Sequence, residues 1–428
     1  MAPAKIIIDT DPGIDDVLAL LLALSSKAEE IQVLMISLTF GNIDVKNCLR
    51  NTVSMFHVVE REMEWRRQHG LPEGFESLKA HRPLIAVGAE RTLDEQTLLA
   101  DYFHGKDGLG DVHTSHSHLI PTHPYEALFD ANSEASVEEL EEAARHHSSF
   151  IASRKPAHRE VLRLLRENEP DSVVIVAVGP LTNLALAAAE DPETFLRAKE
   201  VVVMGGVVDG PGNMSPVAEF NTFADAMAAA RVFALTSPEP QVTMPTAPAS
   251  IPLPNYPAKL SRQLKLRLAP LDVTRLHNVT RGQYRGRSAS VLSSGSPLGE
   301  FVSAILSHAF DKLDSLHHGH EGDKAELTLH DPVCVWYALT ESTGLWKFQT
   351  TDIRVETRGQ WTRGMCVVDR RNRKKAEVDG VNDDDPDQWL GKSGNRIDVI
   401  VETPGGEKLA PFLFDRIFGG RVIDCLAP

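Results

Sequence analysis

Short apolar runs that stop at Gly, Pro, Asn or Asp recur along the chain, and a helix-like stretch follows most of them. Continuous runs rich in Val and Ile are typical of strands buried on both faces, the pattern of a parallel sheet. Ala- and Leu-rich stretches such as residues 181–190 and 225–234 predict crossover helices. The predicted strands lie within residues 5–13, 33–42, 82–90, 172–183 and 200–206, with a weaker one in QVTMP at 241–245. We therefore expect an α/β fold with a mostly parallel central sheet flanked by helices, a Rossmann-like open sheet.

Four stretches interrupt this pattern, near residues 61–78, 125–150, 245–270 and 370–388. We interpret them as surface insertions in a single domain of residues 1–428, because the strand pattern resumes after each of the first three. Within the second, a helix is expected to begin near Ser136. The segments TDIRVETRG and GMCVVDRRN in the C-terminal third predict one or two β-hairpins added to the sheet.

Composition and charge narrow the range of partners. The chain is 42% hydrophobic and 24% charged, which is ordinary for a soluble globular protein. Its net charge of -16 argues against a nucleic-acid backbone or an anionic membrane surface as partner. No apolar run approaches the roughly 18 residues that a membrane span needs. The four cysteines form no CxxC pair, so we expect reduced thiols in a cytoplasmic protein.

The stretch DTDPGIDD places Asp9, Asp11, Asp15 and Asp16 within eight residues at the end of the first predicted strand. In open parallel sheets ligands bind at this end of the strands. Asp15 and Asp16 could cap the next helix, but capping does not explain four like charges whose repulsion needs a compensating cation. Carboxylate oxygens in this number suit a hard cation such as Ca²⁺.

A phosphatase of the haloacid-dehalogenase type is a further alternative for the same stretch. Those enzymes use Asp-x-Asp after an apolar run, with a Thr or Val two residues later. Gly13 occupies that position here, and the Asp15-Asp16 pair would have no role.

Several motifs in sequence order resemble the calcium-dependent inosine-uridine-preferring nucleoside hydrolases. After DTDPGIDD come TFGN ending at residue 42, HGKDGLG at 104–110, VGPLTNLA at 178–185, VVMGG ending at 206, GNMSPVAEFN at 212–221, PLDVT at 270–274, LHDPVCVWYAL at 329–339 and VETRGQWTRGMCVVDRR at 355–371. The resemblance covers most of the chain apart from the insertions. It implies hydrolysis of the N-glycosidic bond of ribonucleosides to ribose and free base, through an oxocarbenium-like transition state, in nucleoside catabolism and salvage.

The resemblance also implies a role for individual residues. The expected Ca²⁺ ligands are the carboxylates of Asp11, Asp16 and Asp331 and the backbone carbonyl of Val178. Asp11 would also be the general base for a calcium-bound water. His330 would protonate the leaving base.

The remaining implied residues bind the substrate. Asp15 would form a hydrogen bond with a ribose hydroxyl. His104 would lie on a mobile loop that closes over the base, so either His104 or His330 could be the acid that protonates it. The other expected contacts with the sugar are Asn42, Met204, Asn213, Glu219 and Asn221. Asp9 would orient its neighbours, and Asp225 would start a helix.

Departures from the family leave the base preference open among purine, pyrimidine and both. Arg275 follows LDVT where family members often have His, and the insertions change loops that build the base side of the pocket. A catalytically silent nucleoside- or ribose-binding protein on the same scaffold is the alternative function, although every ligand position and the EFN of the sugar site are present. The family is typically dimeric or tetrameric, so a homo-oligomer is expected.

Overall fold

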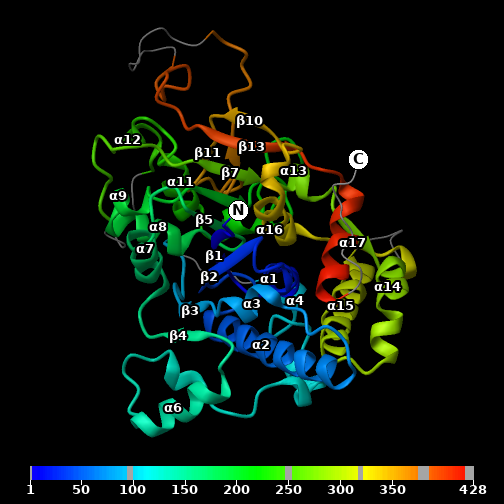
Figure 1. Ribbon diagram of the computed structural model, residues 1–428. Helices are drawn as coiled ribbons and strands as arrows, with labels where there is room; N and C mark the ends of the chain where they lie inside the picture. Colours follow the sequence, from blue (N-terminus) through cyan, green and yellow to red (C-terminus); the bar gives the residue numbers. More distant parts are fainter. Residues whose placement is uncertain (1, 94–99, 246–252, 317–321, 375–384, 420–428) are drawn as a thin grey trace.

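A nine-stranded sheet crosses the molecule, and every pair of neighbours in it is parallel except β10 and β13 (Figure 1). The structure is a computed structural model that describes residues 2–93, 100–245, 253–316, 322–374 and 385–419. Across the sheet the strands are β10 (Lys347–Thr351), β13 (Ile397–Glu402), β7 (Leu266–Ala269), β6 (Glu200–Met204), β5 (Val173–Ala177), β1 (Ala4–Thr10), β2 (Ile31–Leu38), β3 (Leu84–Val87) and β4 (Ile151–Ser153). The predicted mostly parallel α/β sheet is confirmed.

Strand β1 shows why the sheet is covered on both sides. Ile6, Ile7 and Ile8 are fully buried, and Ile6 and Ile8 pack into one core while Ile7 packs into the other. Successive side chains of a strand point to opposite faces, so three consecutive isoleucines need a helical layer on each side.

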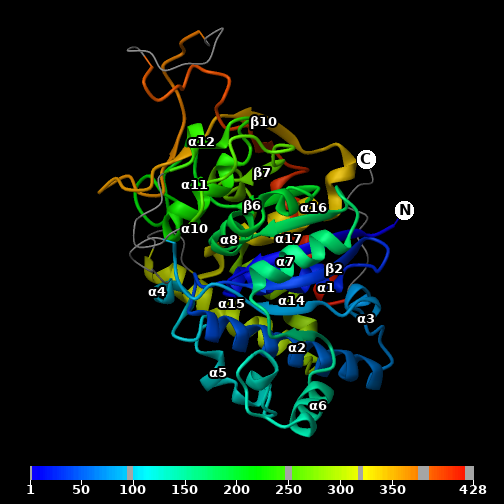
Figure 2. The ribbon, with the colours of Figure 1, turned by 90° about the vertical axis from the view of Figure 1, so that its left-hand side faces the viewer.

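Different helices cover the two faces of the sheet. Figures 1 and 2 show α2 and α11 on opposite sides of the molecule. One core is formed with α1 (Ile14–Ser25), α2 (Val45–Gln68), α15 (Pro297–Leu316), α16 (His330–Thr340) and α17 (Gly406–Ile417). The other is formed with α7 (Ala157–Glu167), α8 (Thr182–Glu190), α9 (Pro192–Phe195) and α11 (Ala226–Ala234).

Shorter elements complete the described chain. Two small antiparallel pairs join β8 (Asn278–Thr280) to β9 (Glu326–Thr328) and β11 (Arg354–Val355) to β12 (Cys366–Val367). The second pair joins the two segments predicted to form a C-terminal hairpin, but it is a separate sheet and is not added to the nine-stranded one. The remaining α-helices are α3 (Glu76–Ala80), α4 (Asp101–His104), α5 (Val112–Ser115), α6 (Val137–His146), α10 (Phe220–Ala224), α12 (Pro240–Thr243), α13 (Leu271–Thr274) and α14 (Arg281–Ser293).

The structure tests two of the four interruptions in detail. The predicted helix near Ser136 is confirmed as α6, which Ser136 caps by accepting the Glu139 N–H at 3.3 Å. Interpreting residues 61–68 as a surface insertion was wrong: they are the last turns of α2. Glu62 and Arg66 are buried there and form an ion pair at 2.7 Å, one helical turn apart.

The predicted weak strand at 241–245 was also wrong. Pro240 begins the short helix α12, and proline suits the first turn of a helix. The place beside β6 in the sheet is taken by β7, which lies in the third predicted insertion. Parts of the third and fourth insertions, residues 246–252 and 375–384, lie outside the described residues.

The strand order places a ligand site at the centre of the sheet. From β1 the chain continues to β2, β3 and β4 on one side, and β5, β6 and β7 follow on the other. Such a reversal of strand order opens a crevice at the carboxyl ends of the strands. None of the described helices is both long and apolar enough to cross a membrane.

Candidate active site

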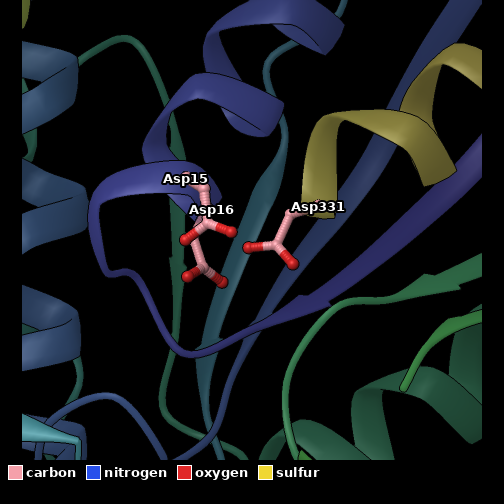
Figure 3. A group of neighbouring side chains, drawn as sticks. All are labelled: Asp15, Asp16 and Asp331. Carbon is pink, nitrogen blue, oxygen red and sulfur yellow. The ribbon is translucent and has the colours of Figure 1, made fainter. Parts of the chain in front are cut away.

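Three carboxylates meet beyond the end of β1 (Figure 3). Asp15 and Asp16 come from the first turn of α1, and Asp331 comes from the first turn of α16. One oxygen of each lies within 4.8 Å of the others, and nowhere else among the described residues do three or more His, Cys, Asp or Glu side chains lie so close. The fold thus joins residues that are more than three hundred positions apart.

Asp11 is fully buried directly after β1. Its Oδ2 accepts the N–H of Asn42 at 2.6 Å, whereas its Oδ1 has no hydrogen-bond partner among the described residues. Glycines leave room for this carboxylate: a Cβ at Gly41 would lie 2.0 Å from Oδ2, and one at Gly179 would lie 2.5 Å from Oδ1. A buried carboxylate oxygen without a partner is costly unless a cation or a proton satisfies it.

Asp16 is held by four donors. Its Oδ1 accepts hydrogen bonds from Thr10 Oγ1 at 2.6 Å and from the Asp11 N–H at 3.2 Å. Its Oδ2 accepts from the Gly13 N–H at 3.1 Å and from Asn42 Nδ2 at 2.8 Å. Asp15 is the only partly exposed member of the trio.

Burial and mutual repulsion disfavour ionisation of these carboxyl groups. Burial, with repulsion from Asp16, raises the pKa of Asp11 well above its usual value and that of Asp15 to about 7. Burial also raises the pKa of Asp16, and burial with repulsion from the other three raises that of Asp331. A cation shared by the group would allow the carboxylates to ionise together. The cluster therefore fits a metal site.

A cavity of about 590 Å³ opens beside the cluster. The predicted site residues that line it are Asp15, Asn42, His104, Val178, Met204, Asn213, Glu219, Asn221, His330 and Asp331. Asp11 and Asp16 do not line it and are fully buried. The lining thus includes carboxylate and amide groups with which a polar ligand would find partners.

On the β6 side of the cavity, Glu219 and Asn221 are tied to the backbone. The Glu219 carboxylate caps α10 and accepts the N–H groups of Gly206, Asn221 and Thr222 at 2.8–2.9 Å. Asn221 Nδ2 donates to the carbonyl of Val178 at 2.8 Å and, more weakly, to that of Met204 at 3.3 Å. These bonds fix this wall of the cavity.

The two candidate histidines line the cavity in fixed orientations. His104 Nδ1 accepts the N–H of Ile14 at 3.3 Å, and His330 Nδ1 pairs with Thr274 Oγ1 at 2.8 Å. Burial lowers the pKa of His104 to about 3 and that of His330 to about 4, in the latter with the charge of Arg275 adding to the effect. Both rings are neutral at pH 7, with Nε2 left for the cavity.

Asp9 and Asp225 lie away from the cavity. Asp9 Oδ1 accepts hydrogen bonds from Ser37 and Asn183, which belong to β2 and α8. Asp225 caps α11 through the Ala228 N–H at 2.9 Å, so the expectation that it starts a helix is confirmed.

Sequence reasoning missed the apolar wall of the cavity. Its members come from separate elements, differ in burial and share no motif, so nothing in the sequence marks them: Ile14, Phe103, Phe220, Leu313, Leu316 and Leu327. In the sequence, Arg275 stands out only as a departure from the family pattern. The structure places Arg275 in the lining of the cavity. A flat apolar group could lie against this wall while a polar group faces the carboxylates.

Comparison with known proteins agrees with this geometry. The chain matches the family model described as inosine-uridine preferring nucleoside hydrolase over residues 6–390. It is 29% identical over 366 residues to the pyrimidine-specific ribonucleoside hydrolase RihA of Klebsiella pneumoniae subsp. pneumoniae, covering 85% of this chain and 88% of that protein. It is 26% identical over 415 residues to the probable uridine nucleosidase 2 of Arabidopsis thaliana, covering 96% and 97%.

Solved structures share the fold. A plant nucleoside hydrolase, the PpNRh1 enzyme, superposes with a TM-score of 0.64 at 22% identity, covering 97% of this chain and 99% of that one. A purine-preferring ribonucleoside hydrolase from Gardnerella vaginalis gives 0.64 at 20% identity, covering 97% and 98%. The family match speaks against a haloacid-dehalogenase-type phosphatase. The chain belongs to the inosine-uridine preferring nucleoside hydrolase family and is an enzyme that hydrolyses ribonucleosides to ribose and free base.

Proposed function

We propose that the reaction takes place in the cavity beside the carboxylate cluster, with ribose on the carboxylate side and the base against the apolar wall. The observation that carries this proposal is the convergence of Asp15, Asp16 and Asp331 to within 4.8 Å at the carboxyl end of the sheet. Polar groups around a sugar favour the complete ribose, because an analogue lacking a hydroxyl would leave buried donors and acceptors unpaired.

We assign Ca²⁺ to the carboxylates of Asp11, Asp16 and Asp331 and the carbonyl of Val178, so that two members of the cluster, Asp16 and Asp331, would hold the ion and the third, Asp15, would be left for the sugar. Support comes from the unpaired Oδ1 of Asp11, the all-oxygen donor set and the raised pKa values of the carboxyl groups. When bound, the ion neutralises the carboxylates, positions ribose hydroxyls and makes a nearby water molecule more acidic.

The chain's own residues then supply the proton transfers. Asp11 is also the proposed general base, because a carboxylate that would help to hold the ion would stand next to the water to be deprotonated. His330 is the proposed donor to the departing base through Nε2, because Thr274 occupies its Nδ1. The ring is neutral in the free site, so it must first take up a proton before it can pass one to the leaving nitrogen. His104 offers a second Nε2 on the same side.

Asp15 is the proposed ribose ligand, since it is partly exposed and lines the cavity. The four donors already bound to Asp16 make the division between Asp15 and Asp16 worth testing directly. Asp16→Asn should weaken Ca²⁺ binding more than Asp15→Asn, whereas Asp15→Asn should mainly raise KM. The reverse order in a calcium titration followed by calorimetry would exchange the two roles.

The activity test uses uridine and inosine, because similar proteins carry both pyrimidine and purine names. Ribose is measured as reducing sugar, and the base is measured by chromatography. Wild-type enzyme with Ca²⁺ should release equal amounts of both products, and Asp11→Asn should release neither at a comparable rate. Tight nucleoside binding without release would instead favour the silent binding protein.

We further propose a homo-oligomer, dimer or tetramer, in the cytoplasm, acting in nucleoside salvage. The described cysteines Cys48, Cys334 and Cys366 are free and buried, as a reducing compartment would leave them. Light scattering coupled to size-exclusion chromatography measures the subunit number, and a mass of one chain would contradict an oligomer.

A further inference from the structure

One short helix holds five consecutive residues of the loop that leads to Asn213. The Asp272 carboxylate of α13 accepts the N–H groups of residues 208, 209 and 210 at 2.7–2.8 Å. Arg275, which follows α13 directly, donates to the carbonyls of Pro211 at 2.8 Å and Gly212 at 3.3 Å. The carboxylate of Asp272 thus accepts from the N–H groups of this loop, and the guanidinium of Arg275 donates to its carbonyl groups.

The loop needs such support because its own hydrogen bonds begin only at Gly212. Gly212 donates to the carbonyl of Pro216, and Asn213 donates to that of Ala218. Residues 209–211 are exposed and include Gly210 and a proline. Arg370 also contacts this loop, donating to the Val208 carbonyl at 2.6 Å and pairing with Asp209 at 2.7 Å, but both side chains are exposed and such an ion pair orders a loop only weakly. A Cβ at Gly212 would lie 2.1 Å from a backbone oxygen, which shows how tightly the chain turns there.

Helix α13 is a firm base for these bonds. Leu271, Val273 and Thr274 are buried, and the Leu271 N–H donates to the carbonyl of Gly206 at 2.9 Å. Asp272 does not line the cavity, whereas Asn213 does. Any influence of Asp272 on substrate must therefore pass through the loop.

Asn213 is the group that the loop presents. Its Oδ1 accepts the Phe220 N–H at 2.9 Å, which leaves Nδ2 as its donor toward the cavity. This inference rests on the proposed function, with ribose on the carboxylate side, and adds to it that the neighbouring 2′- and 3′-hydroxyls face the carboxylate cluster. The 5′-hydroxyl is then the ribose oxygen left for Asn213.

We propose that Asp272 and Arg275 are positioning residues that hold residues 208–212 so that Asn213 can bind the 5′-hydroxyl of the nucleoside. Losing either one frees the loop, and the enzyme loses its preference for substrates that carry this hydroxyl. A purely structural role would instead lower activity equally for all substrates.

The experiment compares kcat/KM for uridine and 5′-deoxyuridine in Ca²⁺-loaded enzyme, or for inosine and 5′-deoxyinosine if inosine is turned over faster. Asp272→Asn should raise KM for the complete nucleoside roughly tenfold and change kcat/KM for the 5′-deoxy analogue little, because only the complete substrate loses a hydrogen bond. Asn213→Ala should show the same loss of preference. The double variant should be no worse than Asn213→Ala alone, since the two act as one unit.

Asp191→Asn is the matched control, because Asp191 also binds a backbone N–H, that of Thr194 at 3.0 Å, but does so away from the cavity. It should keep the wild-type preference. If Asp272→Asn does not fold, Asp272→Ser carries the test, because Arg275 itself lines the cavity and its charge acts on His330.

The outcomes separate the two levels of the argument. Suppose that the wild-type enzyme turns over the nucleoside and the folded variant keeps the wild-type preference for the 5′-hydroxyl. This result would overturn the positioning role and leave the proposed function intact. An unchanged preference in Asn213→Ala would overturn the 5′-hydroxyl contact. No product from any nucleoside with wild-type enzyme would instead overturn the proposed function.

Discussion

Asp11 is held in a space that only its glycine neighbours leave open. A methyl group at Gly179 would lie 2.5 Å from Asp11 Oδ1, well inside contact distance. The backbone at this glycine needs no left-handed conformation, so alanine would act through its bulk alone. The site therefore depends on two residue types at once, the acid and the glycines that admit it.

Gly179→Ala tests this arrangement. The added methyl group should displace the Asp11 carboxylate, and a shift of about 1 Å at a reacting group can cost about a hundredfold in rate. Steady-state kcat is the measurement. Gly286→Ala in α14 is the control, because nothing lies within 4 Å of its added methyl group, and it should keep wild-type kcat. Wild-type kcat in Gly179→Ala would contradict a role for the Asp11 position.

The orientation of His330 depends on Thr274. Thr274 is fully buried and pairs with His330 Nδ1 at 2.8 Å. Thr274→Val removes this bond with little change in volume, so the ring should lose its fixed orientation. We expect kcat to fall roughly tenfold with KM little changed, the lower end for loss of a group that orients a catalytic histidine or ligand. Thr274→Ser should restore most of kcat, and equal losses in both variants would argue against an orienting hydroxyl.

At the scale of elements, the buried strands near the centre of the sheet could be predicted, and the edges could not. The apolar runs of β1, β2, β5 and β6 are long and buried on both faces, which marks them in the sequence. The edge strand β10 has mostly exposed residues, and β7 has only four residues, so neither carries a comparable pattern. Packing across the sheet, which the sequence does not state, decides such elements.

Some residues of the candidate site could be predicted from the sequence and others could not. Residues grouped in motifs at strand ends were found, because the fold brings those ends together. Residues such as Asp272 and Leu313 act through three-dimensional neighbours that lie far away in sequence, so no local pattern marks them. The family resemblance alone grouped Asp331 with Asp11 and Asp16, and the structure places Asp331 beside Asp15 and Asp16.

Asp225 gives a prediction for the elements that frame the site. Its carboxylate caps α11 and also accepts hydrogen bonds from the Leu93 N–H and from Thr182 Oγ1, both at 2.7–2.8 Å. Asp225→Ala should therefore reduce the free energy of unfolding by about 1–3 kcal/mol, with kcat retained in the folded enzyme. Urea denaturation measures the first quantity. A large loss of kcat without loss of stability would instead give Asp225 a direct part in the reaction.

For the whole molecule, the carboxylate cluster links stability to pH and to calcium. The folded-state pKa of Asp15 is about 7, and those of Asp11 and Asp331 are also raised, so folding favours the protonated forms. In metal-free protein this contribution is complete below pH 3.8 and is lost as the pH rises through about 7. Ca²⁺ competes with these protons, so its stabilising effect grows with pH.

The difference in Tm between calcium-loaded and chelator-treated protein should consequently be larger at pH 8 than at pH 5. Groups that titrate alike in the calcium-loaded and the chelator-treated protein change both Tm values equally, so they cancel in this difference. Differential scanning calorimetry at fixed ionic strength measures it. A difference that is equal at the two pH values, or larger at pH 5, would mean that the ion does not bind to these carboxyl groups.

The central claim is that ribonucleoside hydrolysis depends on a divalent cation held by the carboxylate cluster at the end of β1. It is tested most directly by stripping the enzyme with a chelator, returning Ca²⁺ in small steps and measuring bound calcium and ribose release in the same samples. We expect no significant release from the stripped enzyme and a rate that rises in proportion to bound calcium up to one ion per chain. At the same calcium concentrations, the Asp331→Asn variant should recover neither bound calcium nor ribose release. Full ribose release by stripped enzyme in excess chelator would contradict the account.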